Sequence, residues 1–294
     1  MNSRKWTRRE FGSAALAVAG TAAAVRYGFA EARATRGLAF VGSHTGQDES
    51  GGSLHAFLVD GDRWHLEQTL ATAAPAHLVA HPTLPVLYAV HNVGTWDCLP
   101  RGAVSTYRFH RSSGLLTHLH TQPLSLAATH PPHAVLTAGA SHLFVAAEGG
   151  GIYNLLPVAA DGTLRPPSAI RKEFGMEQNG MWKAAAPNSV ALLPDGSLLA
   201  ADAGQETLTS FSVQDGLLVL NGRTRVHRGE GPAHLTLSPD GSYAYTAGAA
   251  QGLVRRHTLI AGRAADETTT GQRHQVPVAP VLAHVPDAVS LLVI

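Results

Sequence analysis

One stretch of this sequence is used twice. The residues from Pro187 to Ala201, PNSVALLPDGSLLAA, align almost unit for unit with those from Pro232 to Thr246, PAHLTLSPDGSYAYT. Each copy has an apolar run, a Pro-Asp-Gly turn and a second apolar run, which predicts two buried antiparallel strands joined by a tight turn. One such unit cannot bury its apolar faces alone, so the copies must stack against one another.

Weaker copies start at Pro75, Pro132 and Pro280, and the five prolines are spaced by 45 to 57 residues. A fourth strand is expected behind a Gly-Leu or Gly-Thr-Leu turn, after a third strand at residues 52–59, 103–109, 151–158, 207–213 and 253–259. This period suits a four-stranded propeller blade. The sequence therefore predicts an all-β fold, a β-propeller with three strands of a first blade, four complete blades and two further strands, or about five to six blades.

The first 34 residues read as an export signal and are set apart from the fold. Thr7 to Phe11 contains a twin-arginine motif, and Ala34 ends a small-x-small cleavage pattern. The apolar stretch at residues 12–25 is weakly hydrophobic and shorter than the about 20 residues that cross a bilayer core. We expect residues 35–294 to form the propeller domain, periplasmic or secreted through the twin-arginine pathway, with no membrane span after cleavage.

Charge argues against polyanionic partners. Without residues 1–34 the chain keeps 16 basic and 19 acidic residues, a formal net charge of −3, and no Lys/Arg cluster remains. We therefore expect neither nucleic acid nor an anionic membrane as partner. The single cysteine, Cys98, cannot form an internal disulfide and is expected to be a surface thiol.

Candidate site residues follow from blade geometry. The first strand of a blade starts at one face of the disc and the antiparallel second strand returns to it, so residues flanking the pair converge on one mouth of the central channel. These residues are His77, His133, Asn188 and His234 before the first strands, and His44, His91 with Asn92, Glu148 and Asp202 after the second strands. Imidazoles and carboxylates suit acid–base chemistry. The alternative is structural, because such histidines also bond a neighbouring backbone and such acids also cap turns.

The 17 histidines invite a zinc hypothesis, but the pairs His118/His120 and His130/His133 have no cysteine or local third ligand. No converging set of carboxylates and carbonyls suggests calcium either. We expect no metal or other cofactor. Trp96 and Trp182 fall in long loops, where they either line a pocket or anchor the loop.

Several of these segments are similar to the bacterial lactonase family, which includes propeller-type 6-phosphogluconolactonases and a fungal carboxy-muconate cyclase. They are the Pro-x-His and Pro-Asp-Gly units, Leu87-Tyr88-Ala89-Val90, Gly149-Gly150-Gly151, Asp202-Ala203-Gly204 and the long loop 94–102. The resemblance runs from about Leu38 to the C-terminus. It implies a fold that is usually seven-bladed, with a C-terminal segment that completes the N-terminal blade. Here the copies are fewer, so the ring is either smaller and irregular or shortened at the C-terminus, and one of the last two strands is left over.

The resemblance also implies a lactonase-like hydrolase that opens a small sugar lactone or related cyclic ester. Glu148 or neutral His133 would draw a proton from the attacking water, and other imidazoles with Asn92 would donate hydrogen bonds to the developing oxyanion. This assigns catalytic roles to His133, Glu148, His234 and Asp202, and substrate binding to His44, His77, His91, Asn92 and Asn188.

Substrate choice and the competing functions remain open at this point. Family members often carry Arg-His where this chain reads Ala233-His234, so a phosphate-binding arginine is not evident, and together with export this favours a ligand other than a phosphosugar. The alternatives are a muconate-type lactone-forming cyclase, a non-catalytic exported binding scaffold, and a family member that has lost its activity.

Overall fold

The computed structural model describes residues 36–45, 51–61, 63–178, 180–226, 231–248, 253–264, 276–277 and 287–294. The export signal expected over residues 1–34 lies outside these residues. Among the residues described, no helix has the length and apolar character needed to cross a bilayer.

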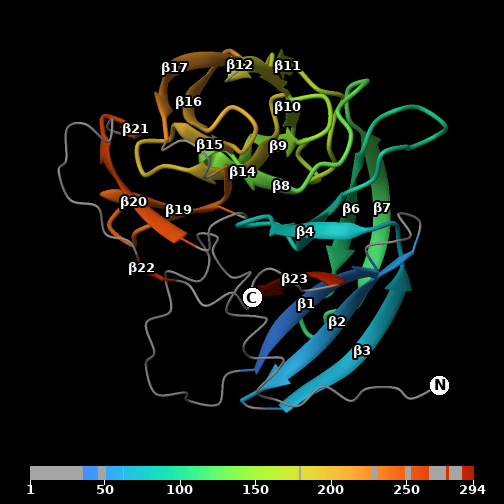
Figure 1. The fold of residues 1–294 in the computed structure, drawn as a ribbon. Coiled ribbons are helices and arrows are strands. Elements are labelled where there is room, and N and C mark those ends of the chain that lie inside the picture. The colour runs from blue at the N-terminus through green and yellow to red at the C-terminus, as the bar shows by residue number, and fades with distance from the viewer. Residues whose placement is uncertain are drawn as a thin grey trace.

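Five antiparallel sheets follow one another around an arc (Figure 1), which confirms the all-β propeller architecture. The first sheet has β1 (Arg36–Thr45), β2 (Gly52–Asp60), β3 (Arg63–Ala71) and β23 (Asp287–Val293); the second has β4 (Pro75–Ala80), β5 (Val86–His91), β6 (Ala103–Phe109) and β7 (Leu116–Pro123). The third has β8 (His133–Leu136), β9 (His142–Ala147), β10 (Ile152–Pro157) and β11 (Ala169–Lys172).

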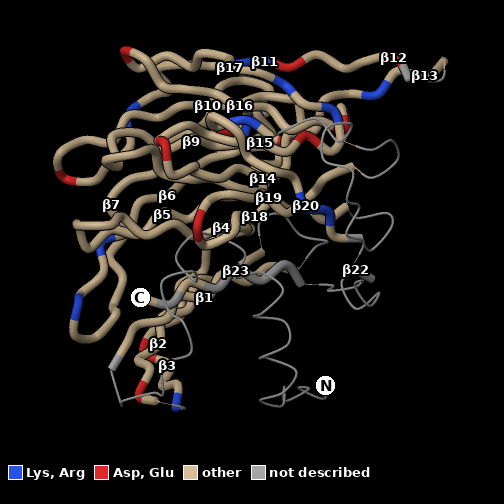
Figure 2. Tube along the Cα trace, turned by 90° about the vertical axis from the view of Figure 1, so that its left-hand side faces the viewer, with Lys and Arg blue, Asp and Glu red and all other residues tan. Residues whose placement is uncertain are grey.

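The fourth sheet has β14 (Pro187–Leu192), β15 (Leu198–Asp202), β16 (Thr207–Gln214) and β17 (Leu217–Arg225). The fifth has β18 (Pro232–Leu237), β19 (Tyr243–Gly248), β20 (Leu253–Ile260) and β21 (Arg263–Ala264), with β22 (Val276–Pro277) paired to β20. A separate hairpin, β12 (Met176–Gln178) with β13 (Met181–Lys183), precedes β14 and extends beyond the sheets (Figure 2).

The Pro-Asp-Gly turns explain why the strand pairs form where the repeats predict them. Gly196 adopts φ +85° between β14 and β15, a conformation that only glycine reaches without strain. The carboxylate of Asp195 accepts hydrogen bonds from the backbone N–H and the hydroxyl of Ser197, at 2.9 and 2.6 Å. Asp240 plays the same part in the next copy, accepting from Ser238 and Ser242. The turn chemistry thus sets the register of both repeats.

The C-terminal strand completes the N-terminal sheet. β23 pairs antiparallel with β1, from Ala39 opposite Val293 to Thr45 opposite Asp287, and becomes the innermost strand of the first sheet. A single strand makes this closure, while the short β22 joins the fifth sheet. Around the centre, the innermost strands β23, β4, β8, β14 and β18 are neighbours in turn.

The core consists of apolar layers between successive sheets. Phe40, Leu54 and Leu87 lie between the first two sheets, Tyr88, Leu143 and Leu156 between the second and third, and Phe144, Tyr153 and Phe211 between the third and fourth. Burial of large side chains on both faces of the middle sheets is the main source of stability in such a stack.

The glycine run at 149–151 lets two chain segments approach closely. A Cβ on Gly149 would meet the Thr129 hydroxyl at 1.9 Å, and one on Gly150, where φ is +79°, would meet the Ala127 carbonyl oxygen at 2.0 Å. Residues 127–129, before β8, therefore pack closely against the residues that follow β9, and Thr129 and Gly149 form a backbone bridge there. This contact fixes how the chain enters β8 at His133.

Candidate active site

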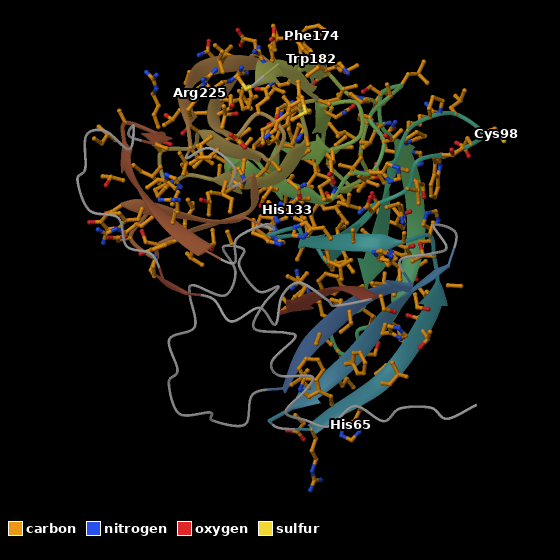
Figure 3. The ribbon with its side chains drawn as sticks, in the orientation of Figure 1. His65, Cys98, His133, Phe174, Trp182 and Arg225 are labelled. Carbon is orange, nitrogen blue, oxygen red and sulfur yellow. The ribbon has the colours of Figure 1, made fainter. Side chains whose placement is uncertain are left out.

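Three histidines from three different sheets meet near the centre of the arc. His77 lies on β4, His133 begins β8, and His234 lies on β18. Each of them is near the N-terminal end of the innermost strand of its sheet. The rings of His77 and His133 stack with centroids 3.8 Å apart and an interplanar angle of 26°. His234 is close enough to His133 to perturb its pKa. Figure 3 shows His133 where β8 approaches β4.

Burial keeps these imidazoles neutral at neutral pH. It lowers the pKa of His77 from 6.5 to about 4, against the opposing effect of a hydrogen bond with the backbone of Ala134. Burial also lowers the pKa of His133 well below 6.5, and the nearby His77 and His234 lower it further. His234 is exposed overall, yet enough protein surrounds its ring for desolvation to lower its pKa as well.

A neutral imidazole carries one N–H donor and one lone-pair acceptor, so this group can both take and give a hydrogen bond. The buried Nδ1 of His133 has no hydrogen-bond partner among the described residues. Within the described ranges, the nearby groups that perturb His133 electrostatically are the imidazoles of His77 and His234, and the pKa of His77 and of His234 is lowered mainly by burial. The three imidazoles are therefore polar but uncharged at neutral pH.

The strand register shows which residue of the fourth sheet corresponds to the histidines. In each of the three sheets, one backbone N–H donates across the turn that joins the two inner strands, and the histidine lies four residues before that donor. The donors are His81, Thr137 and Ser238, for His77, His133 and His234 respectively. In the fourth sheet this turn residue is Leu193, so the equivalent residue is Ser189. Its hydroxyl accepts a 3.2 Å hydrogen bond from the backbone N–H of Leu235. Counting back from the turn would have found Ser189 in the sequence.

Asn188, expected among the mouth residues, occupies a β-bulge. The pairing moves from Pro187 opposite Asp202 to Ser189 opposite Ala201, which leaves Asn188 outside the ladder. The bulge recurs before His77 and His234, because one extra residue follows the opening proline there too. The spacing of one residue from Pro132 to His133, where no bulge forms, selects Asn188, whereas the spacing of two in the bulged sheets selects Ser189.

His91 is a fully buried member of a hydrogen-bond chain within the second sheet. Its Nδ1 bonds the carbonyl oxygen of Ala73 at 2.5 Å, its Nε2 bonds the hydroxyl of Ser105 at 2.7 Å, and Ser105 bonds Thr121 at 2.7 Å. The ring also stacks on Trp96, with centroids 5.1 Å apart. Burial lowers the pKa of His91 to about 4. This geometry anchors the loop at 94–102 and engages both ring nitrogens of His91 with Ala73 and Ser105.

Asp202 is 1% exposed and supports the backbone before β14. Its Oδ1 accepts from the backbone N–H of Ala186 at 2.9 Å and of Gln205 at 2.8 Å. Burial raises the pKa of Asp202, while these hydrogen bonds and one from Gly204 oppose the rise. The carboxylate lies at the interface between the third and fourth sheets, within electrostatic range of Tyr153.

The remaining expected residues lie at the same end of their sheets as the histidines. Glu148 follows β9, two residues after Ala146, which pairs with His133, and its side chain is exposed. Asn92 follows β5 at the corresponding position, and its backbone N–H bonds the carbonyl of Ala74 at 2.9 Å. His44 lies near the end of β1 and is half-buried. These three stay candidates for contact with a ligand.

Two apolar side chains in the segment between β11 and β14 are open to solvent. Phe174 is 73% and Trp182 68% exposed, and both lie far from His133 in Figure 3. Cys98 is an exposed free thiol at the tip of its loop. Within the described ranges, no group of three or more His, Cys, Asp or Glu side chains is arranged to hold a metal ion.

Five stacked sheets of antiparallel strands, with polar side chains gathered where their innermost strands meet, define a β-propeller with a central site. The chain belongs to the family described as lactonase, 7-bladed beta-propeller, whose model matches residues 38–265. Five of the seven sheets of that architecture are thus recognisable in the described residues.

Individual relatives are distant. The chain is 23% identical over 215 residues to a 6-phosphogluconolactonase of Bacillus subtilis, covering 72% of this chain and 59% of that protein. A putative 6-phosphogluconolactonase of Bacteroides fragilis matches with a TM-score of 0.69 at 22% identity, over 84% of this chain and 68% of the other. The periplasmic gluconolactonase PpgL of Pseudomonas aeruginosa matches with a TM-score of 0.66 at 25% identity, over 84% and 69%. This chain therefore spans about three fifths of its curated relative.

Proposed function

We propose that this protein hydrolyses an uncharged lactone, of a sugar or a related cyclic ester, at the centre of the arc. The observation that carries the proposal is the stacked pair of neutral imidazoles, His77 and His133, with His234 beside them. Membership of the lactonase family and the 6-phosphogluconolactonase relatives support the reaction class.

His133 is assigned the general base. Its buried Nδ1 has no partner in the described part of the chain, so its lone pair is open to a proton from the attacking water. A donated N–H from His77 or His234 would stabilise the negative charge that develops on the carbonyl oxygen. No covalent nucleophile is needed. Glu148, exposed at the same end of the third sheet, is the alternative base.

The charge expected of the substrate follows from the charges around the three histidines. A phosphorylated lactone brings about two negative charges, which need Arg or Lys partners when water is displaced. In the part of the chain that the structure describes, the neighbouring groups that perturb these imidazoles electrostatically are themselves imidazoles, and no Arg or Lys is among them. We therefore expect an unphosphorylated lactone to be opened faster than its phosphorylated counterpart.

The test is a lactone panel assayed with the purified full chain. Glucono-δ-lactone, its 6-phosphate and an aliphatic lactone are followed by proton release against buffer at matched pH. The proposal requires enzyme-dependent opening that His133→Asn abolishes and that His65→Asn, an exposed histidine on β3, leaves in place. No turnover of any lactone, with or without binding, would reject hydrolysis. Loss of activity in Glu148→Gln with retention in His133→Asn would move the base to Glu148.

We also propose export through the twin-arginine pathway, on the basis of Arg8 and Arg9 before the weakly apolar stretch. The resemblance to a periplasmic gluconolactonase agrees with it. Replacing both arginines with lysine should hold the protein in the cytoplasm of a twin-arginine-competent host, as seen by cell fractionation. Unchanged export in that variant would exclude this route.

A further inference from the structure

The interface between the third and fourth sheets contains a polar group of side chains in an otherwise apolar layer. Tyr153 on β10 faces the fourth sheet, because its ring contacts Phe211 of β16 with centroids 5.3 Å apart. Asp202 and Thr207 are direct cross-strand partners on β15 and β16, and their side chains therefore share one face of that sheet. This face also carries Ala200 and Phe211, which pack in one cluster with Tyr153. The three polar side chains thus point into the same layer.

Each of these side chains is 1% exposed, and each has a polar atom without a hydrogen-bond partner in the described part of the chain. The atoms are Oη of Tyr153, Oδ2 of Asp202 and Oγ1 of Thr207. The charge of Asp202 perturbs the Tyr153 hydroxyl, which places the two groups within electrostatic range. Three such atoms in one place are unusual, because buried polar groups are nearly always paired.

Neighbouring charges do not satisfy these atoms. Glu173 bonds Arg171 at 2.7 Å and also Arg223, and none of these three side chains hydrogen-bonds Oη of Tyr153, Oδ2 of Asp202 or Oγ1 of Thr207. The Oδ1 of Asp202 is occupied by backbone N–H groups, which leaves Oδ2 as the acceptor that needs a donor.

We propose that one water molecule is bound between the third and fourth sheets by Tyr153, Asp202 and Thr207. The two hydroxyls donate to its oxygen, and the water donates to Oδ2 of Asp202, which pairs all three atoms at once. A metal cation fits this set less well, because it would satisfy the oxygens and leave both hydroxyl hydrogens without an acceptor. The three polar partners meet the two to four that a buried water needs.

The position of the water gives it a structural role near the centre. Through Asp202 it is linked to the backbone of Ala186, one residue before β14 begins, and β14 carries Ser189 at the histidine-equivalent position. Through Tyr153 it is linked to the third sheet, whose innermost strand carries His133. The water thus ties together two of the sheets that surround the candidate active site.

The test counts long-lived internal waters in the full chain by ¹⁷O magnetic relaxation dispersion, alongside a high-resolution crystal structure. We expect density for one water within hydrogen-bond distance of all three atoms. We also expect the double substitution Tyr153→Phe with Thr207→Val to lower the count by one. Tyr88→Phe is the matched control, because this buried hydroxyl donates directly to the Gly162 carbonyl at 2.8 Å and should leave the count unchanged.

A crystal structure in which Tyr153 bonds Asp202 directly, with no water between them, would overturn the proposal. So would an unchanged water count in the double variant. If that variant does not fold, the wild-type density decides alone. None of these measurements uses lactone turnover, so the water site and the proposed function can fail independently.

Discussion

The rings of His77 and His133 lie face to face, 3.8 Å apart, although they belong to the innermost strands of different sheets. Two protonated imidazoles could not occupy this arrangement, because like charges at this distance repel strongly in a buried setting. The two stacked rings are therefore uncharged at neutral pH, and their contact joins the second and third sheets.

The first prediction concerns catalysis at this stack. His133→Asn removes the proposed base and should lower kcat/KM by about 100-fold or more, the usual range for general base catalysis. His77→Asn should raise the pH below which activity is lost on acidification, because the nearby His77 lowers the pKa of His133. Lactone proton-release assays from pH 5 to 8 measure both. Wild-type kinetics in His133→Asn would remove this residue from the mechanism.

The second prediction is acid sensitivity of the fold. Burial lowers the pKa of His77, His91 and His257 from 6.5 to about 4 in the folded state. Between these values the unfolded chain binds more protons, so the free energy of unfolding should fall as pH falls, by about 1.4 kcal/mol per pH unit for each histidine.

Urea unfolding at half-unit steps from pH 7 to 4 measures this loss. The exposed variant His65→Asn should show the same slope as the wild type, since it alters no buried imidazole. A free energy of unfolding that stays level between pH 6.5 and 4 would contradict the assignment of neutral buried histidines.

The third prediction compares two glycines of similar backbone conformation. Gly150 has φ +79° with a carbonyl oxygen 2.0 Å from the position of an added Cβ, whereas Gly139 has φ +71° with open space around it. Gly139→Ala should cost about 1–2 kcal/mol for the left-handed conformation alone. Gly150→Ala should cost clearly more, because the segment before His133 must also move. Equal losses in thermal unfolding would show that the close contact is unimportant.

The fourth prediction separates the supporting role of Asp202 from a catalytic one. Asp202→Ala leaves the buried backbone N–H groups of Ala186 and Gln205 without their acceptor, and should lower stability by about 1–3 kcal/mol. Turnover per folded molecule, measured well below the unfolding temperature, should remain near wild type. A loss of 100-fold without loss of stability would instead return Asp202 to the chemistry.

The sequence predicted the sheets well because turn chemistry and strand periodicity are local. The strands expected at 103–109 and 207–213 are observed as β6 and β16, with at most one residue of difference. The outer strand of the third sheet was harder to place. The described residues just after Gly162 form a single bridge, between Val158 and Leu164. The outer strand β11 starts later, at Ala169, because a further turn intervenes.

The candidate site was only partly predictable. His77, His133 and His234 could be grouped because the repeats place them at the same strand end. The burial of His91 and Asp202 was not visible, because it depends on partners distant in sequence, such as Ser105 and Tyr153. Asn188 was taken one residue after Pro187, as His133 stands one residue after Pro132, whereas a bulge puts the equivalent residue two places after the proline, as for His77 and His234.

The pairing of β23 with β1 also constrains the order of folding. The inner edge of β1 pairs with residues more than 240 positions later in the chain. During synthesis this edge therefore stays unpaired until the strands of the four other sheets have been made. Non-local pairing of this kind is slow and exposes a strand edge to other chains. The N-terminal sheet is thus the first to begin and the last to be finished, and in pulse-labelled refolding its β1 amides should gain protection after those of β9 and β15.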